Sequence, residues 1–160
     1  MTVTAPEMAN GIFGGVFNLN YSGDKNRLIW HRHWLVCISC GAYAGVGCFL
    51  FAPRGLMYGF VASLFTSCCS IWADYVHIED PQHLAHLVDR WAAFHFFFVL
   101  VCECAYVLHM PIWYLTMTLC LALALFSLSR SSRSRQSWVL LHSAWHVLPM
   151  GLLLLPGLIS

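Results

Sequence analysis

The chain has 160 residues, of which 59% are hydrophobic and only 9% are charged, and its formal net charge is +1. This composition is typical of an integral membrane protein, and the length allows one helical bundle without a separate soluble domain. The near-neutral charge and the lack of a basic patch with interleaved aromatic residues argue against nucleic-acid binding.

The predicted elements, in chain order, are a surface segment followed by apolar helices. Residues 1–28 are polar to mixed in character and form the predicted N-terminal surface segment, whereas residues 29–160 form a single transmembrane domain. Turn-forming and polar residues separate the apolar stretches, as in the tight turn at residues 53–55. The sequence therefore predicts an all-α integral membrane bundle of about five transmembrane helices, at residues 29–52, 56–77, 87–108, 112–128 and 138–159.

The basic residues are distributed unevenly over the two sides of this predicted bundle. With five spans, only Arg54 falls on one side, and the other seven basic residues fall on the opposite side: Lys25, Arg27, Arg32, Arg90, Arg130, Arg133 and Arg135. By the positive-inside rule the basic side is cytoplasmic, or faces the matrix in a mitochondrial membrane. The expected location is multi-pass, in an endomembrane or in the mitochondrial inner membrane.

The first span carries two patterns of small residues. Gly41 and Gly45 form a GxxxG, which favours close packing against another helix and makes other membrane subunits candidate partners through this face. Cys37 and Cys40 form a CxxC without the flanking residues of a redox or zinc module. We interpret these cysteines as small apolar packing residues.

Two histidines stand in the last predicted span, in the run HSAWHVLPMGLLLLPGL. His142 and His146 are four residues apart, so their imidazoles project from one face of the helix, about one turn from each other. Burying an ionisable group within a membrane span costs free energy, which favours a functional site over a role in helix packing alone. Two imidazoles at this spacing suit a divalent metal such as zinc; hydrogen bonds to neighbouring helices are the alternative.

Five spans bring further polar residues to the same side of the membrane. His77 ends the second predicted span and Asp89 begins the third. Both are expected at the same depth in the membrane as His142 and His146. Three imidazoles and a water form a common catalytic zinc set, and a nearby carboxylate can act as general base. Asp74, three residues before His77, either orients that imidazole or simply lies at a solvated helix end.

These motifs resemble the alkaline ceramidase and adiponectin-receptor superfamily of membrane hydrolases. The resemblance rests on HSAWHVL in the last span, a His closing the second span and an Asp opening the third. It implies zinc ligands at His77, His142 and His146, a catalytic role for Asp89, and zinc-dependent hydrolysis of a lipid amide, with membrane lipids as partners. Members of that superfamily usually have seven spans and a Ser four residues before the second-helix His, where this chain has Ala73.

Two other functions remain open from the sequence. The Ala at position 73, the small size and the GxxxG pattern favour a non-catalytic accessory subunit of a larger membrane complex, such as a respiratory assembly. Haem ligation by histidines, with His95 in the third span as one candidate, is the third hypothesis. Metal analysis distinguishes the three, because only the first requires zinc and only the third requires haem.

Overall fold

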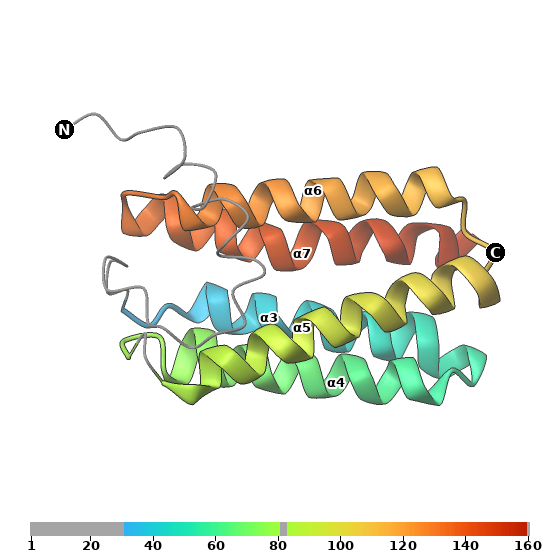
Figure 1. The fold of residues 1–160 in the computed structure, drawn as a ribbon, viewed down its shortest axis with the longest axis horizontal. Helices are drawn as coiled ribbons and strands as arrows, with labels where there is room; N and C mark the ends of the chain where they lie inside the picture. The colour runs from blue at the N-terminus through green and yellow to red at the C-terminus, as the bar shows by residue number, and fades with distance from the viewer. Residues whose placement is uncertain (1–30, 81–82, 160) are drawn as a thin grey trace.

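The structure is a computed structural model, and it describes residues 31–80 and 83–159. The predicted surface segment at residues 1–28 lies outside the described residues. Five helical segments in the described part are long and apolar enough to cross a membrane: Trp34–Arg54, Met57–Val76, Leu84–Val107, Ile112–Arg130 and Arg135–Pro156. They lie side by side along one direction (Figure 1), which confirms the predicted all-α membrane bundle of five spans.

The first two spans form a helical hairpin. The first comprises α3 (Trp34–Val46), the π-helix η1 (Gly47–Phe51) and the 3₁₀ turn η2 (Ala52–Arg54). The second comprises α4 (Met57–Ile71) and the π-helix η3 (Trp72–Val76). The reversal between them uses Gly55 in a left-handed conformation (φ 70°), which a glycine adopts without steric cost. The tight turn predicted at residues 53–55 is therefore confirmed.

The remaining three spans are α5 (Leu84–Cys102) with the π-helix η4 (Glu103–Val107), α6 (Ile112–Arg130) and α7 (Arg135–Ile159). The third and fifth begin three residues earlier than predicted. His83 explains the early start of α5, because its ring Nδ1 accepts a hydrogen bond from the backbone N–H of Ala85 and so caps the helix.

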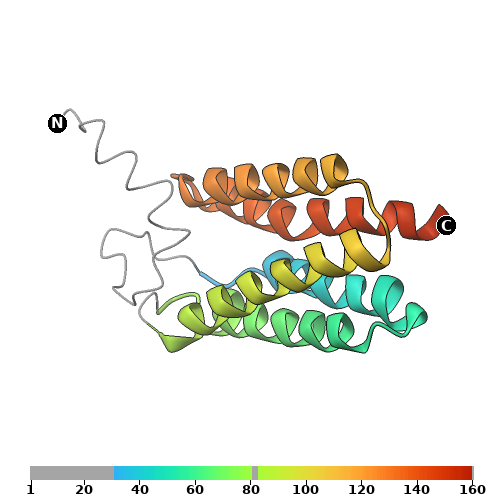
Figure 2. The ribbon, with the colours of Figure 1, turned by 45° about the vertical axis from the view of Figure 1, so that its right-hand side comes forward.

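The packing order leaves one side of the bundle open. The extensive helix pairs are α3 with α4, α3 with α7, α4 with α5, and α6 with α7. The third span approaches α6 through η4, at one end of the bundle. From there α5 diverges from α6 and α7, as both Figure 1 and Figure 2 show. The space between the backbones of α5, α6 and α7 is therefore a cavity only where side chains do not fill it.

Two hydrophobic clusters occupy different levels of the bundle. The larger one lies toward the end that carries Arg54 and includes Phe51, Phe96 and Met150. The smaller one lies toward the opposite end and consists of Val36, Ile78, Trp138 and Val139. Along α3 and α7 the buried polar residues fall between the members of these two clusters. A polar layer is thus enclosed between two apolar ones.

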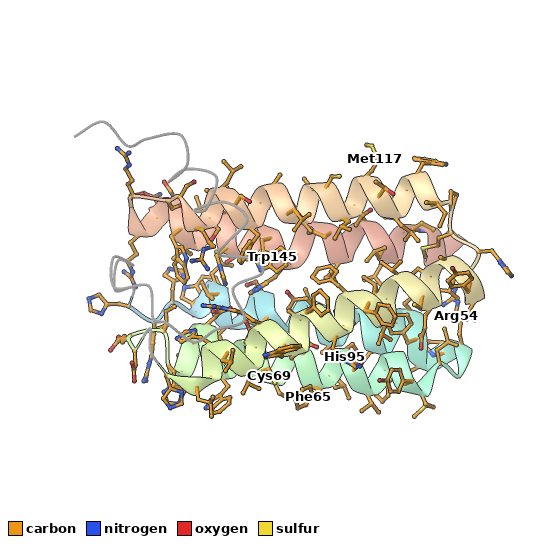
Figure 3. The ribbon with its side chains drawn as sticks, viewed as in Figure 1. Arg54, Phe65, Cys69, His95, Met117 and Trp145 are labelled. Atoms are coloured by element: carbon orange, nitrogen blue, oxygen red, sulfur yellow. The ribbon has the colours of Figure 1, made fainter. Side chains whose placement is uncertain are left out.

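The described basic residues are arranged as the positive-inside argument predicts. Arg54 lies at one end of the bundle (Figure 3), next to the turn between the first two spans. At the opposite end Arg32 donates a hydrogen bond to the carbonyl oxygen of Val76 (3.0 Å), and Arg135 donates one to the carbonyl oxygen of Arg32 (3.0 Å). These bonds tie the starts of α3 and α7 to the end of the second span.

Candidate metal centre

The histidine pair of the last span is buried inside the bundle. His142 and His146 are 7% and 1% exposed, and their ring centroids lie 4.7 Å apart at an interplanar angle of 74°. Trp138 stacks on the His142 ring, and Tyr43 of α3 meets the edge of the His146 ring. These aromatic contacts restrict the orientation of both imidazoles.

A carboxylate from the second span faces both histidines. Asp74 is 7% exposed, and its Oδ2 atom lies 3.0 Å from His142 Nε2 and 3.9 Å from His146 Nε2. Asp74 stands in η3, whose wider turn is closed by a bond from His77 N–H to the Trp72 carbonyl oxygen (3.1 Å). Single π-helical turns inside α-helices occur frequently at functional sites.

Serine hydroxyls hold the outer nitrogen of each imidazole. Ser129 Oγ of α6 lies 3.2 Å from His142 Nδ1, and Ser39 Oγ of α3 lies 3.1 Å from His146 Nδ1. Metal-binding histidines are usually oriented in this way, with the nitrogen that does not bind the metal engaged in a hydrogen bond. Each Nε2 atom is left directed toward Asp74.

The hydrogen bonds of Ser39 assign the proton of His146. Ser39 Oγ donates its single proton to the carbonyl oxygen of Val36 (2.8 Å), so it accepts a hydrogen bond from His146 Nδ1. A neutral His146 then carries its proton on Nδ1, and the lone pair of Nε2 faces the Asp74 carboxylate. Two electron-rich atoms facing each other in a buried site repel, and a metal ion, or a proton on the ring or on the carboxyl group, would relieve this repulsion.

Cys40 of α3 adds a thiol to this group. Its Sγ atom lies 3.7 Å from His146 Nδ1. Among the described residues, Cys40, Asp74 and His146 form a buried group whose ligand atoms all lie within 4.8 Å of one another, and this group could hold a metal ion. Ligands of a tetrahedral zinc ion lie about 3.3 to 3.6 Å apart, and the distances from Asp74 Oδ2 to the Nε2 atoms of His142 and His146 are 3.0 and 3.9 Å. Imidazole, carboxylate and thiolate are also the donors that zinc takes.

Asp89 lies beside this centre and is bonded to a serine. Ser70 Oγ donates a hydrogen bond to Asp89 Oδ1 (2.6 Å), which links α4 to α5. Asp89 and Ser70 line a cavity of about 600 Å³, and Asp74, His142 and His146 line the same cavity. The structure thus brings three of the four predicted site residues, Asp89, His142 and His146, to one cavity.

The fourth predicted residue, His77, makes different contacts. Its ring stacks on His83, with centroids 3.5 Å apart and planes 3° from parallel, and it meets the edge of Trp72. His77 lies one turn closer to the membrane surface than Asp74, and it does not belong to the described residues that line the cavity. The second span therefore supplies Asp74 to the histidine pair, where the sequence predicted His77.

The partners that other helices contribute to the histidine pair were not predicted from the sequence. Asp74 was recognisable as a carboxylate within the second span, four residues after Ser70, which lines the same cavity. Ser39 and Ser129 gave no signal, since hydroxyl residues are common in apolar helices.

His95, the haem candidate, lies apart from the metal centre. It is exposed on α5 (Figure 3), and its Nε2 atom lies 2.8 Å from the hydroxyl oxygen of Tyr58. No second histidine is among the described ring contacts of His95, whose partner is Tyr58.

Comparisons with family models, with curated proteins and with solved structures found no match to this chain.

Proposed function

We propose that this protein is a zinc-dependent membrane hydrolase that cleaves a lipid amide, as in the ceramidase-like enzymes it resembles. The proposed zinc ligands are His142, His146 and Asp74, so a carboxylate replaces the second-helix His of that superfamily. Two imidazoles and one carboxylate form a known catalytic zinc set that leaves a position for water. The arrangement of these three residues is the support for this assignment.

One observation carries the proposal. Both Nε2 atoms are directed at the same carboxylate oxygen, at 3.0 and 3.9 Å, while a serine hydroxyl holds each Nδ1 atom. One hydrogen bond from His142 would already satisfy this carboxylate oxygen, so the second imidazole directed at it supports a metal-binding role. Cys40 is an alternative metal ligand, or a weak hydrogen-bond acceptor for His146 Nδ1.

The remaining polar residues of the cavity fit roles in amide hydrolysis. Zinc held by such a set supplies a bound water of lowered pKa as the nucleophile. Asp89 is suited to accept a proton from the attacking water and to deliver it to the departing amine nitrogen. The hydrogen bond from Ser70 fixes the orientation of the Asp89 carboxylate. Tyr43, Trp138 and Trp145 enclose the centre and limit the access of bulk water.

Metal analysis of the purified protein tests this function. We expect about one zinc per chain in the wild type, and loss of zinc in Asp74→Ala and His146→Ala. His77→Ala is the matched control and should keep its zinc, because its ring stacks on His83. Wild-type protein without metal, or loss of zinc in His77→Ala alone, would overturn the ligand set. Iron in place of zinc would point to oxidative chemistry.

A role as a non-catalytic subunit of a larger membrane complex is the second candidate, and the face around Gly41 and Gly45 favours it. A Cβ atom added at either glycine would meet no described atom within 4 Å. This GxxxG therefore does not pack closely against a described helix of this chain, and it is accessible to a helix of another protein. Zinc-free protein that is stable only with copurifying subunits would decide for this role.

A further inference from the structure

The cavity beside the metal centre has two long walls, formed by α5 and α6. The residues of α5 that line it recur at helical spacing, from His86 to Val101, and those of α6 run from Leu119 to Arg130. Each set therefore forms one continuous stripe along its helix. The volume of about 600 Å³ is within the range of cavities that bind organic ligands.

The two stripes change from polar to apolar at corresponding levels. In α5 the polar members come first, and the later ones are apolar, among them Phe94, Phe97 and Phe98. In α6, which runs in the opposite direction, the members up to Phe126 are apolar and the polar ones come last. Because the helices are antiparallel, the polar parts of both walls lie at the same end of the bundle. The cavity is polar at the basic membrane face and apolar toward the membrane interior.

An arginine stands in the polar part of each wall. Arg90 follows Asp89 on α5, and Arg130 follows Ser129 on α6. The Arg130 guanidinium lies over the ring of Phe126, 5.7 Å from its centroid, so its side chain extends along the cavity wall. Ser129, the chain neighbour of Arg130, lies 3.2 Å from His142. Two arginines thus line the polar part of the cavity that also holds the proposed reaction site.

The apolar part of the cavity is closed on its inner side and open to lipid. Trp145 of α7 (Figure 3) contacts the rings of both Phe97 and Phe126, whose centroids lie 5.8 and 5.3 Å from its own. Phe94 and Phe98 of α5 and Leu123 of α6 line this part of the cavity and are exposed, so this side of the bundle faces the membrane. A ligand with a long apolar chain can enter sideways without crossing the aqueous phase.

We propose that the substrate is a lipid with an anionic, phosphate-bearing headgroup next to its amide-linked acyl chain. This inference deepens the proposed hydrolase function and rests on it for the claim that the bound lipid is cleaved. The phosphate binds between Arg90 and Arg130, and the acyl chain lies along the phenylalanines of α5 and α6. Guanidinium groups form paired, charge-assisted hydrogen bonds with phosphate, and basic sites between membrane helices bind acidic lipids in this way.

The position of the metal centre agrees with this orientation. The amide of such a lipid lies between its headgroup and its acyl chain, and Asp74, His142 and His146 line the same cavity as the two arginines and the phenylalanines. Hydrolysis would add the oxygen of water to the acyl carbon, break the carbon–nitrogen bond and transfer a proton to the amine. The products are a fatty acid and a lipid amine that keeps the phosphate.

Binding measurements with two matched lipids test the inference. Ceramide 1-phosphate and ceramide with the same chains differ only in the phosphate, and their affinities for the purified protein can be compared by native mass spectrometry. We expect ceramide 1-phosphate to bind about tenfold or more tightly. The double variant R90Q/R130Q should lose this preference. Equal affinity for the two lipids in the wild type would overturn the inference.

Three controls separate the possible causes of such a result. Arg133→Gln removes an exposed arginine of the same face that does not line the cavity, and it should keep the preference. R90K/R130K retains both charges without the paired hydrogen bonds, so it should keep part of the preference for ceramide 1-phosphate that R90Q/R130Q loses. Equal loss in both variants, with unchanged thermal stability, would mean that the charge of these residues does not bind the phosphate. Glycerol 3-phosphate has the anion without an acyl chain, and equally strong competition by it would refute the acyl-chain site.

Asp74→Asn distinguishes failure of this inference from failure of the hydrolase proposal. It should lose zinc and amide cleavage but still bind ceramide 1-phosphate more tightly than ceramide, because both arginines remain. Phosphate preference without any cleavage by the wild type would refute the enzyme and leave the lipid site. Cleavage of ceramide with no preference for its phosphate would refute the lipid site and leave the enzyme.

Discussion

The carboxylate of Asp74 and the imidazole of His142, 68 residues apart in the chain, lie 3.0 Å from each other in the interior of the bundle. Both groups are almost fully buried, so neither is solvated by bulk water. A buried carboxylate is stable only when cations or hydrogen-bond donors compensate it. This contact connects the second and fifth spans and defines the centre of the candidate site.

Replacement of the serine behind His146 should weaken metal binding. Ser39→Ala removes the acceptor that fixes His146 Nδ1, so we expect zinc affinity to fall by about 10- to 100-fold. Competition with a chelator of known affinity measures the change. Ser127→Ala is the matched control, because the Ser127 hydroxyl donates only to the carbonyl oxygen of Leu123 on its own helix. Equal zinc affinities in both variants would contradict the orienting role.

Restoring a histidine in the second span should preserve the metal site. Asp74→His supplies an imidazole at the level of Asp74, so we expect the variant to keep about one zinc per chain. Asp74→Leu should lose the metal, because leucine has no donor atom. Mass spectrometry of the intact protein under native conditions reports both stoichiometries. Retention of zinc by Asp74→Leu would exclude Asp74 as a ligand.

Loss of the Asp89 carboxylate should suppress catalysis without loss of metal. Asp89→Asn is expected to lower the rate of lipid-amide hydrolysis by about 10² to 10⁴, as for removal of a general base. Its zinc content should remain that of the wild type, since Asp89 is not among the proposed ligands. Ser70→Ala should have a smaller effect on the rate, because it removes only the hydrogen bond that orients Asp89. A metal-free Asp89→Asn protein would show that Asp89 acts as a ligand.

Cysteine labelling should confirm the odd number of spans. A cysteine introduced in the 129–136 loop and one added after Ser160 should react with a membrane-impermeant reagent from opposite sides. The native cysteines all stand within the five spans, where an aqueous reagent reacts poorly. Labelling of both positions from the same side would mean an even number of spans and would separate His142 from Asp89.

Replacement by alanine should lower the stability of the bundle at Gly59 but not at Gly45. A Cβ atom at Gly59 would collide with the Glu103 carboxylate and with the ring of Phe51, which is fully buried, so Gly59→Ala should destabilise the bundle by about 1 to 3 kcal/mol. Gly45→Ala meets open space and should leave the stability of the purified protein unchanged. Thermal inactivation in detergent compares the two variants. A larger loss in Gly45→Ala would mean that a second copy or a partner packs there.

The amino-acid sequence by itself determined the membrane fold and the histidine pair of the candidate site. Hydropathy marks five apolar stretches. Each of them is a helix, because in lipid every backbone polar group must form its hydrogen bond within the helix. The arginine distribution predicts which ends of the helices lie together, and Arg32, Val76 and Arg135 do lie together. The spacing of His142 and His146 fixes both imidazoles on one face, since it depends only on the geometry of one helix.

Only the tertiary structure decided which residues of other helices meet that pair. Asp74 and His77 are three residues apart on the same span, and the choice between them depends on the π-helical turn and on how α4 and α7 each pack against α3. Ser39 and Ser129 come from two further helices, so their distances to the imidazoles are absent from any local pattern. The cavity likewise results from the divergence of α5 from α6, which depends on packing between helices and not on the sequence of either one.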